Sequence, residues 1–275
     1  MNTLQKLSVA TAGAAFMALG AIGAAQAVTV VSPSSLQNVE GDAYNSYPFN
    51  ISNPPNPATP LNSQRYQQVY AATDFGSLSE PHLITRISFR PDATLGSSFA
   101  STLPDIQINF STTTKAPDQL TSTFANNVGA DDTVVYNRGP LPLRSEFTGA
   151  AGGPKAFDIN IDLTTPFLYN PANGNLLLDL RNFAGGSATV FDAQTTVNDP
   201  LSRSYSVAAG VNSTTANGVD SVGLVTQFTL TPTAVPFEFS PGMGLLAVGA
   251  WGAFSHLKSQ QQKRKFLGSE FSSKQ

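Results

Sequence analysis

Apolar and polar residues alternate in short segments through most of the chain between positions 28 and 234. Alternation with a period of two is typical of β-strands that have one buried and one solvated face. The segment 175–180 is more continuously apolar and indicates a more deeply buried strand. The pattern predicts strands over residues 82–90, 105–110, 157–163, 175–180 and 222–230.

Turn-forming residues separate these segments. The sequence Asn-Pro-Ala-Asn-Gly at 170–174 combines a proline that fixes φ with a glycine that can adopt positive φ, and the glycines at 149–154 and 185–186 act alike. The proline-rich segment 53–60 fits a surface loop, because proline cannot donate to a sheet. No segment between 28 and 234 sustains an apolar period of 3.6 with helix caps. The chain is therefore predicted to be all-β, with one antiparallel β-sandwich domain of jelly-roll-like type.

Residues 1–27 have the pattern of a secretion signal peptide. Lys6 supplies the positive charge, and an uncharged apolar run follows it. The run ends in Ala25-Gln26-Ala27, which fits the small-x-small rule for cleavage. We expect the mature chain to begin at Val28, and the alternative is a membrane helix that is kept.

Three elements follow the predicted domain in a fixed order within residues 235–265. A Pro-Phe-Glu motif comes first, a glycine-rich apolar stretch at 242–254 comes second, and a basic cluster comes third. The apolar stretch predicts a short transmembrane helix, and the positive charges after it favour the cytoplasmic side for that end. Residues 266–275 form a polar tail. The motif consists of Pro236, Phe237 and Glu238, and the basic cluster of Lys263, Arg264 and Lys265.

The order of these elements resembles the PEP-CTERM sorting signals of Gram-negative bacteria, and it is most similar to the cyanobacterial form called PFE-CTERM. The matching residues are Pro236, Phe237 and Glu238, followed by Ser240 and Pro241. The resemblance implies that an exosortase, a membrane-embedded transpeptidase-like enzyme, recognises the motif and removes the C-terminal segment. An ordinary single-pass anchor without processing is the alternative.

The domain itself also resembles the ectodomains of other PEP-CTERM-type proteins. The similar stretches are 87–92, 108–113, 166–171 and 174–179. This second resemblance implies a shared architecture for the region 28–234 and says little about activity.

Charge and cysteine content exclude several classes of function. Charged residues make up 12% of the chain, about half the usual share, and residues 28–234 carry nine basic against sixteen acidic side chains, a net charge of −7. An acidic domain lacks the clustered lysines and arginines that bind phosphates, so no nucleic-acid partner is expected. The chain has no cysteine, which excludes thiolate nucleophiles and cysteine-based zinc sites.

Candidate catalytic residues are few. His82 is the only histidine before the C-terminal segment, so a Ser-His-Asp site would need it as the base, but no Gly-x-Ser-x-Gly motif accompanies it. We interpret His82 as a surface residue at the start of a strand. Asp158 and Asp162 share the solvated face of a predicted strand, where they would form either a glycosidase pair or a plain polar edge. The plain edge is the simpler interpretation, so we predict no enzyme, no catalytic residue and no cofactor.

Two groups of residues are candidates for binding. Asp131 and Asp132, after Gly129, would offer oxygen ligands to calcium, and the alternative is a polar turn. Exposed aromatic side chains bind sugar rings, because they combine a flat apolar face with a polar tip. The candidates for such a glycan-facing surface are Tyr44, Tyr47, Tyr66 and Tyr70, and packing in the core or in loops is the alternative for them.

The sequence thus leads to an expectation with one alternative. We expect an exported, exosortase-sorted structural protein of the cell surface or extracellular matrix, without catalytic activity and transiently anchored in the inner membrane. Its expected partners are an exosortase-like processing enzyme, the membrane and, as a candidate, exopolysaccharide. The alternative is a carbohydrate-binding module on the same route, which a row of exposed tyrosines on one sheet face would favour.

Overall fold

The computed structural model describes residues 26–51, 62–207 and 209–233. Packing divides the chain into Met1–Thr233 and Ala234–Gln275, and every described residue belongs to the first unit. The strands are β1 (Val28–Ser32), β2 (Ala43–Asn45), β3 (Gln64–Tyr70), β4 (His82–Phe89), β5 (Phe99–Thr113), β6 (Thr133–Ser145), β7 (Ile159–Tyr169), β8 (Asn175–Asn182), β9 (Phe191–Gln194), β10 (Leu201–Ser206), β11 (Gly218–Asp220), β12 (Gly223–Leu224) and β13 (Thr226–Pro232). Single 3-10 turns occur at η1 (Ser34–Leu36), η2 (Ala72–Phe75), η3 (Phe124–Asn126) and η4 (Pro171–Asn173).

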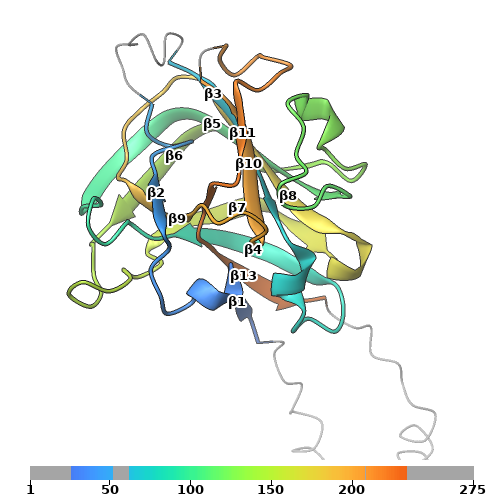
Figure 1. The fold of residues 1–275 in the computed structure, drawn as a ribbon, viewed down its shortest axis with the longest axis horizontal. Coiled ribbons are helices and arrows are strands. Elements are labelled where there is room, and N and C mark those ends of the chain that lie inside the picture. Colours follow the sequence, from blue (N-terminus) through green and yellow to red (C-terminus); the bar gives the residue numbers. More distant parts are fainter. Residues whose placement is uncertain (1–25, 52–61, 208, 234–275) are drawn as a thin grey trace, which may run out of the picture. The chain divides into compact units, whose positions relative to one another are not determined.

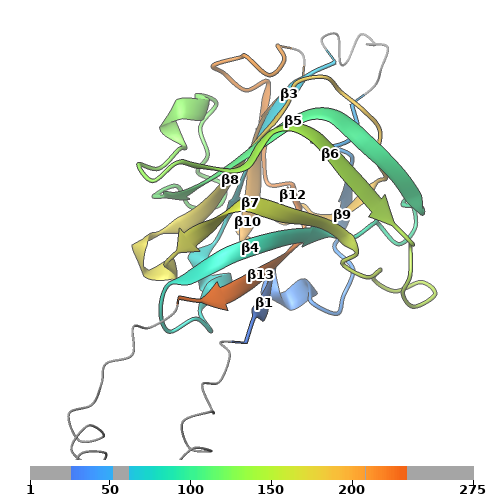
Figure 2. The same ribbon diagram turned by 180° about the vertical axis from the view of Figure 1, so that it is seen from behind.

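These strands form three antiparallel sheets. A four-stranded sheet has the order β1-β13-β4-β7, and a six-stranded sheet has the order β11-β10-β3-β8-β5-β6. A small sheet of β12, β9 and β2 completes the set. Figures 1 and 2 show the two larger sheets on either side of a shared interior. The all-β, antiparallel prediction is confirmed, and the layering is consistent with a β-sandwich.

The alternating segments fall on strands, as the sequence predicts. The segments 82–90, 105–110 and 175–180 lie on β4, β5 and β8, and 157–163 runs into the first half of β7. The segment 222–230 covers β12 and most of β13, and its predicted inner residues Leu224, Thr226, Phe228 and Leu230 are all fully buried. Local alternation was therefore sufficient to identify strands that have one face on the core.

The centre of the core is aromatic and is organised around Phe228 of β13. The ring of Phe228 packs edge-on against Tyr70 at a centroid distance of 4.9 Å and lies 5.1 Å from Phe75. Phe110, from the facing sheet, lies 6.5 Å away. Such aromatic pairs contribute about 0.5–1.5 kcal/mol each beyond the apolar area that they bury. The last strand of the domain is thus central to its packing.

The first and last strands of the domain are paired with each other. Val28 lies opposite Leu230 in the β1–β13 ladder, and β13 ends at Pro232. Both figures place β1 and β13 side by side. Of the predicted signal peptide, Gln26 and Ala27 lie in the described part, where both are exposed directly before β1. No helix within the described residues is long and apolar enough to cross a membrane.

Several predicted features lie outside the described residues. They are Ala25 of the predicted cleavage site, the loop 53–60, the motif Pro236, Phe237 and Glu238, and the cluster Lys263, Arg264 and Lys265. The predicted transmembrane stretch 242–254 also falls there.

Candidate functional site

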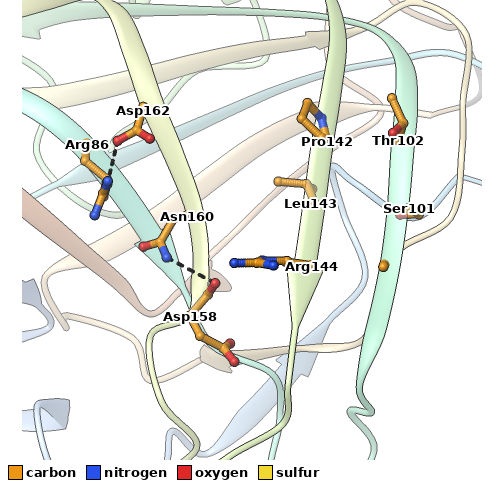
Figure 3. Close-up of a pocket in the computed structure, with 10 residues that line it drawn as sticks. Arg86, Ser101, Thr102, Pro142, Leu143, Arg144, Asp158, Asn160 and Asp162 are labelled. Carbon is orange, nitrogen blue, oxygen red and sulfur yellow. Dashed lines mark hydrogen bonds and ion pairs between the residues drawn. The ribbon is translucent and has the colours of Figure 1, made fainter.

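A groove lies between β6 and β7, where the edges of the two larger sheets meet. Its volume is about 610 Å³. Strands β4 and β7 form one wall, and β5 and β6 form the other (Figure 3). The lining residues are Arg86, Ala100, Ser101, Thr102, Pro142, Leu143, Arg144, Asp158, Asn160 and Asp162.

Alternation along β6 and β7 decides which side chains reach the groove. On β7, Ile159 and Ile161 are buried in the core, so Asn160 and its neighbours on the other face point outward. On β6, Leu143 is buried at 3% exposure, whereas Arg144 next to it is exposed. The wall of polar residues therefore follows from the pleat of each strand.

The β7 wall is held by side-chain hydrogen bonds. Arg86 Nε donates to Asp162 Oδ1 over 2.6 Å, although the two side chains remain 42% and 73% exposed. Ser88 Oγ donates to Asn160 Oδ1 over 2.7 Å, and Asn160 Nδ2 donates to the carbonyl oxygen of Asp158 over 3.2 Å. Figure 3 shows Asp158, Asn160 and Asp162 in a row on the β7 side, with Arg86 of β4 beside Asp162. These bonds orient the amide and the carboxylate before any ligand arrives.

Asp158 has a different role from Asp162. Its Oδ2 accepts a hydrogen bond from the backbone N–H of Glu146 over 2.8 Å, which ties the loop after β6 to the start of β7. The carboxylate therefore serves the loop at one end of the groove. The predicted pair Asp158 and Asp162 does line one groove, from one strand face with Asn160 between them, but each carboxylate has its own intramolecular donor.

Arg144 faces this wall from β6. Its side chain is exposed and makes no hydrogen bond or ion pair with any residue in the described part of the chain. In Figure 3 the guanidinium extends from β6 across the groove toward Asn160 and Asp158. The groove thus contains a cation whose donors are available.

Two of the tyrosines predicted to face a glycan are core residues instead. Tyr66 and Tyr70 are fully buried, with their hydroxyls bonded to Gln68 Oε1 at 2.7 Å and Thr226 Oγ1 at 3.0 Å. Burial raises the pKa of both hydroxyls well above the usual range. The physical reason is that β3 lies between β10 and β8 inside the six-stranded sheet, so these rings face the shared interior.

The other two tyrosines are placed differently again. Tyr47 is half-buried, and its ring lies 5.8 Å from the ring of Tyr205. Tyr44 on β2 is 61% exposed. The four tyrosines therefore do not form the exposed row on one sheet face that would mark an aromatic sugar platform.

The calcium candidates Asp131 and Asp132 both accept hydrogen bonds from β5. Asp131 Oδ1 accepts from the backbone N–H of Thr112 over 2.7 Å, and both oxygens of Asp132 accept from Asn109 Nδ2 over 3.1 Å. These contacts fasten the turn before β6 onto β5. Within the described residues, no group of three or more histidine, aspartate or glutamate side chains is placed to hold a metal ion.

His82 begins β4, as predicted, but it is not a surface residue. The residue is 7% exposed, and its Nδ1 lies 2.8 Å from the carbonyl oxygen of Glu80. The correction has a simple cause, because Pro232 of β13 and Tyr169 of β7 pair with His82 from either side.

A buried ion pair is the main polar feature that sequence reasoning missed. Arg90 and Asp192 are 1% and 0% exposed, and both Nε and Nη2 of Arg90 lie 2.6 Å from Asp192 Oδ2. The N–H of Gly41 donates to Asp192 Oδ1 over 2.9 Å, and Arg90 Nη2 donates to the carbonyl of Val39. Burial raises the pKa of Asp192 to about 6, while the charge of Arg90 lowers it. The pair fixes the 39–41 segment, and an arginine directly after an apolar strand was its only sequence signal.

No protein-family model matches the chain, and a comparison with curated proteins finds no match. The chemistry of the groove is therefore inferred from its own residues. These provide the available cation of Arg144, the exposed ion pair of Arg86 and Asp162, and the oriented amide of Asn160.

Proposed function

We propose that the chain is an exported, exosortase-sorted structural protein of the cell surface or extracellular matrix, associated with exopolysaccharide and without catalytic activity. The order of signal peptide, β domain and Pro-Phe-Glu motif supports the route. The single observation that carries the proposal is the pairing of β1 with β13. Within the described residues the strands run from Val28 to Pro232, so both predicted cleavages fall outside these strands. Removal of the two ends would leave every strand of the described residues in place.

We assign the domain to the jelly-roll type of sandwich. If the small strands β2, β9 and β12 and the two outermost strands β11 and β10 at one end of the six-stranded sheet are set aside, eight strands remain, in the orders β1-β13-β4-β7 and β3-β8-β5-β6. Numbered one to eight along the chain, these strands have the order 1-8-3-6 in the first sheet and the order 2-7-4-5 in the second. This order supports two interlocked Greek keys, the arrangement of jelly rolls. Many functions use this fold, so the assignment alone supports no activity.

The geometry of the two groove carboxylates supports a role without catalysis. In extended backbone at about 3.3 Å per residue, Asp158 and Asp162 have Cα atoms about 13 Å apart, and because side chains on one strand face stand roughly parallel, their carboxyl groups have a similar separation. Glycosidase carboxyl pairs are separated by about 5 Å or about 6.5–9.5 Å. Both carboxylates also have intramolecular donors, Glu146 N for Asp158 and Arg86 for Asp162.

The alternative function is a carbohydrate-binding module on the same route. The positions of Tyr66 and Tyr70 in the core count against an aromatic platform. The available guanidinium of Arg144 favours a polar sugar site in the groove. The two functions are compatible, because a matrix protein requires some contact with the polymer.

Mass spectrometry of the surface-exposed protein tests the route. We expect an N-terminus at Val28 and loss of the segment after the Pro-Phe-Glu motif. Replacement of Pro236, Phe237 and Glu238 by alanine should leave an uncut, membrane-associated form that is heavier by the tail. A mature C-terminus at Gln275 would contradict sorting and leave a plain membrane anchor. Co-fractionation with extracellular polysaccharide tests the matrix association separately.

A further inference from the structure

In the groove between β6 and β7 each carboxylate already has an intramolecular donor, and Asp158 Oδ1 is buried without a hydrogen-bond partner. Asp162 Oδ1 already accepts from Arg86, and Asn160 Oδ1 accepts from Ser88. Asp158 Oδ2 accepts from Glu146 N. Arg144, in contrast, has a guanidinium without any partner among the described residues. A ligand that fits this inventory is rich in acceptors and carries a negative charge.

The groove is large enough to hold a ligand bigger than a small anion. Its volume of about 610 Å³ is much larger than a carboxylate or a phosphate needs. Ala100 and Pro142 give one wall an apolar surface beside the polar residues. Apolar side chains beside the guanidinium of Arg144 match a molecule that has C–H faces, several hydroxyls and one carboxylate. The groove is also open, which suits an internal unit of a long chain.

We infer that this groove binds a hexuronic acid unit of an acidic polysaccharide. The inference rests on the proposed association with exopolysaccharide and names the class of sugar. Arg144 receives the carboxylate through two parallel N–H···O bonds, since the planar guanidinium matches that group in a fork-to-fork geometry. The Nδ2 of Asn160 and the exposed oxygens of Asp162 bond to ring hydroxyls. Pro142 packs against the C–H face of the ring.

The overall charge of the domain makes this site selective. Residues 28–234 carry a net charge of −7, so most of the surface repels an anionic polymer. Binding then depends on the local field of Arg144. Because Arg144 is exposed, the contact should be weak for one sugar unit and sensitive to salt. Affinity for a polymer would come from many copies of the protein along it.

A titration of the full-length protein with two matched sugars tests the inference. The probes are an α-1,4-linked trigalacturonate and its carboxyl-reduced form, which is neutral and otherwise the same. The variants are Arg144→Gln and, as the matched control, Arg181→Gln on β8, a half-buried arginine outside the groove. Isothermal titration calorimetry at low and at high salt gives the affinities, and thermal melts check that each variant is folded.

We expect the effects of carboxyl reduction and of Arg144→Gln on the binding affinity to be strongly coupled in a thermodynamic cycle. Carboxyl reduction and Arg144→Gln should each weaken binding about five- to tenfold, and the two changes together should cost no more than one alone. Arg181→Gln should bind as the wild type does. Equal binding of both sugars with no effect of Arg144→Gln would overturn the inference in favour of a neutral-glycan site. Absence of binding by both sugars also overturns it, yet leaves the sorting route intact, because that route is measured by the mass of the C-terminus.

Discussion

Two arginine–aspartate pairs at the same strand show how burial changes the meaning of one interaction. Arg86 on β4 contacts Asp162 over 2.6 Å, and Arg90, just beyond the end of β4, contacts Asp192 over the same distance. The first pair is 42% and 73% exposed, and the second is 1% and 0% exposed. Identical chemistry at identical distance is thus placed in water in one case and in the protein interior in the other.

The surroundings explain the difference. The buried pair has further partners in the N–H of Gly41, the carbonyl of Val39 and the ring of Phe157, which lies 4.7 Å under the Arg90 guanidinium. Ions removed from water need such partners to offset the lost hydration. The exposed pair keeps its water and can exchange it for a ligand. Burial therefore makes one pair structural and leaves the other available for binding.

The largest expected effect comes from Arg90→Met. This change leaves the Asp192 carboxylate buried without its cation, so the free energy of unfolding at pH 7 should fall by about 3–5 kcal/mol. Burial already raises the pKa of Asp192 to about 6, and loss of Arg90 raises it further. The folded state then binds the proton more tightly than the unfolded state, so part of the loss should return when the pH falls from 7 to 5.

Urea denaturation at both pH values measures this effect, and Arg86→Met, four positions earlier on β4, is the matched control. The control should change the unfolding free energy by less than about 1 kcal/mol. If the two variants were equally stable at pH 7, the contrast drawn between the pairs would be wrong.

A medium effect is expected at Asp199, a carboxylate that has no cation beside it. Its Oδ1 accepts from Leu201 N over 2.7 Å, while its Oδ2 has no hydrogen-bond partner among the described residues. Burial raises the pKa of Asp199 to about 6, and the nearby carboxylate of Asp118 contributes. A raised pKa means that the stability contributed by this group is lost as the pH rises through about 6.

Asp199→Asn keeps the bond to Leu201 and removes the charge, so it should stabilise the protein at pH 7. The gain should be about 0.5–1 kcal/mol, because the side chain is only half-buried. Melting temperatures between pH 7 and pH 4 provide the measurement, and the gain should disappear at the acidic end. A constant gain across that range would show that titration of Asp199 is not its cause.

The smallest effect is expected for the coupling between Arg86 and Asp162. A double-mutant cycle with Arg86→Met and Asp162→Asn should give about 0.5 kcal/mol or less, and 1 M salt should remove most of it. The largely buried pair Arg65 and Asp179 is the comparison, with side chains 13% and 6% exposed. Its coupling should be larger and less sensitive to salt. A reversed order would mean that burial does not set the strength of these pairs.

The fold was predictable where strands alternate and was missed where they do not. β3 was not predicted, because Gln64, Gln67 and Gln68 are polar and nevertheless fully buried. Gln68 is accommodated by partners far away in sequence, its Nε2 donating to the carbonyl of Leu224 over 2.9 Å. β6 was missed as well, since Pro140 and Pro142 interrupt its pattern. The local sequence does not indicate that a glutamine will be buried and hydrogen-bonded to a residue far away in the chain.

The candidate site was predictable only in part. Asp158 and Asp162 were expected on an outward strand face, and they do line the groove. Arg144 was not selected, because its significance depends on β6 lying beside β7, and these strands belong to different sheets. The tyrosines were wrongly predicted for a related reason. Nothing in the sequence distinguishes Tyr66 and Tyr70 from exposed tyrosines, but both lie on a central strand and are buried.

The sequence by itself determined which side of each alternating strand faces the core, because the pleat repeats every two residues and needs no information from elsewhere in the chain. It also contained the order of the terminal signals on which the proposed route rests. Only the tertiary structure decided which polar residues lose their water. Arg86 and Arg90 are four positions apart on nearly the same strand, and the chain segments that pack over them, not their own neighbours in sequence, expose one and bury the other.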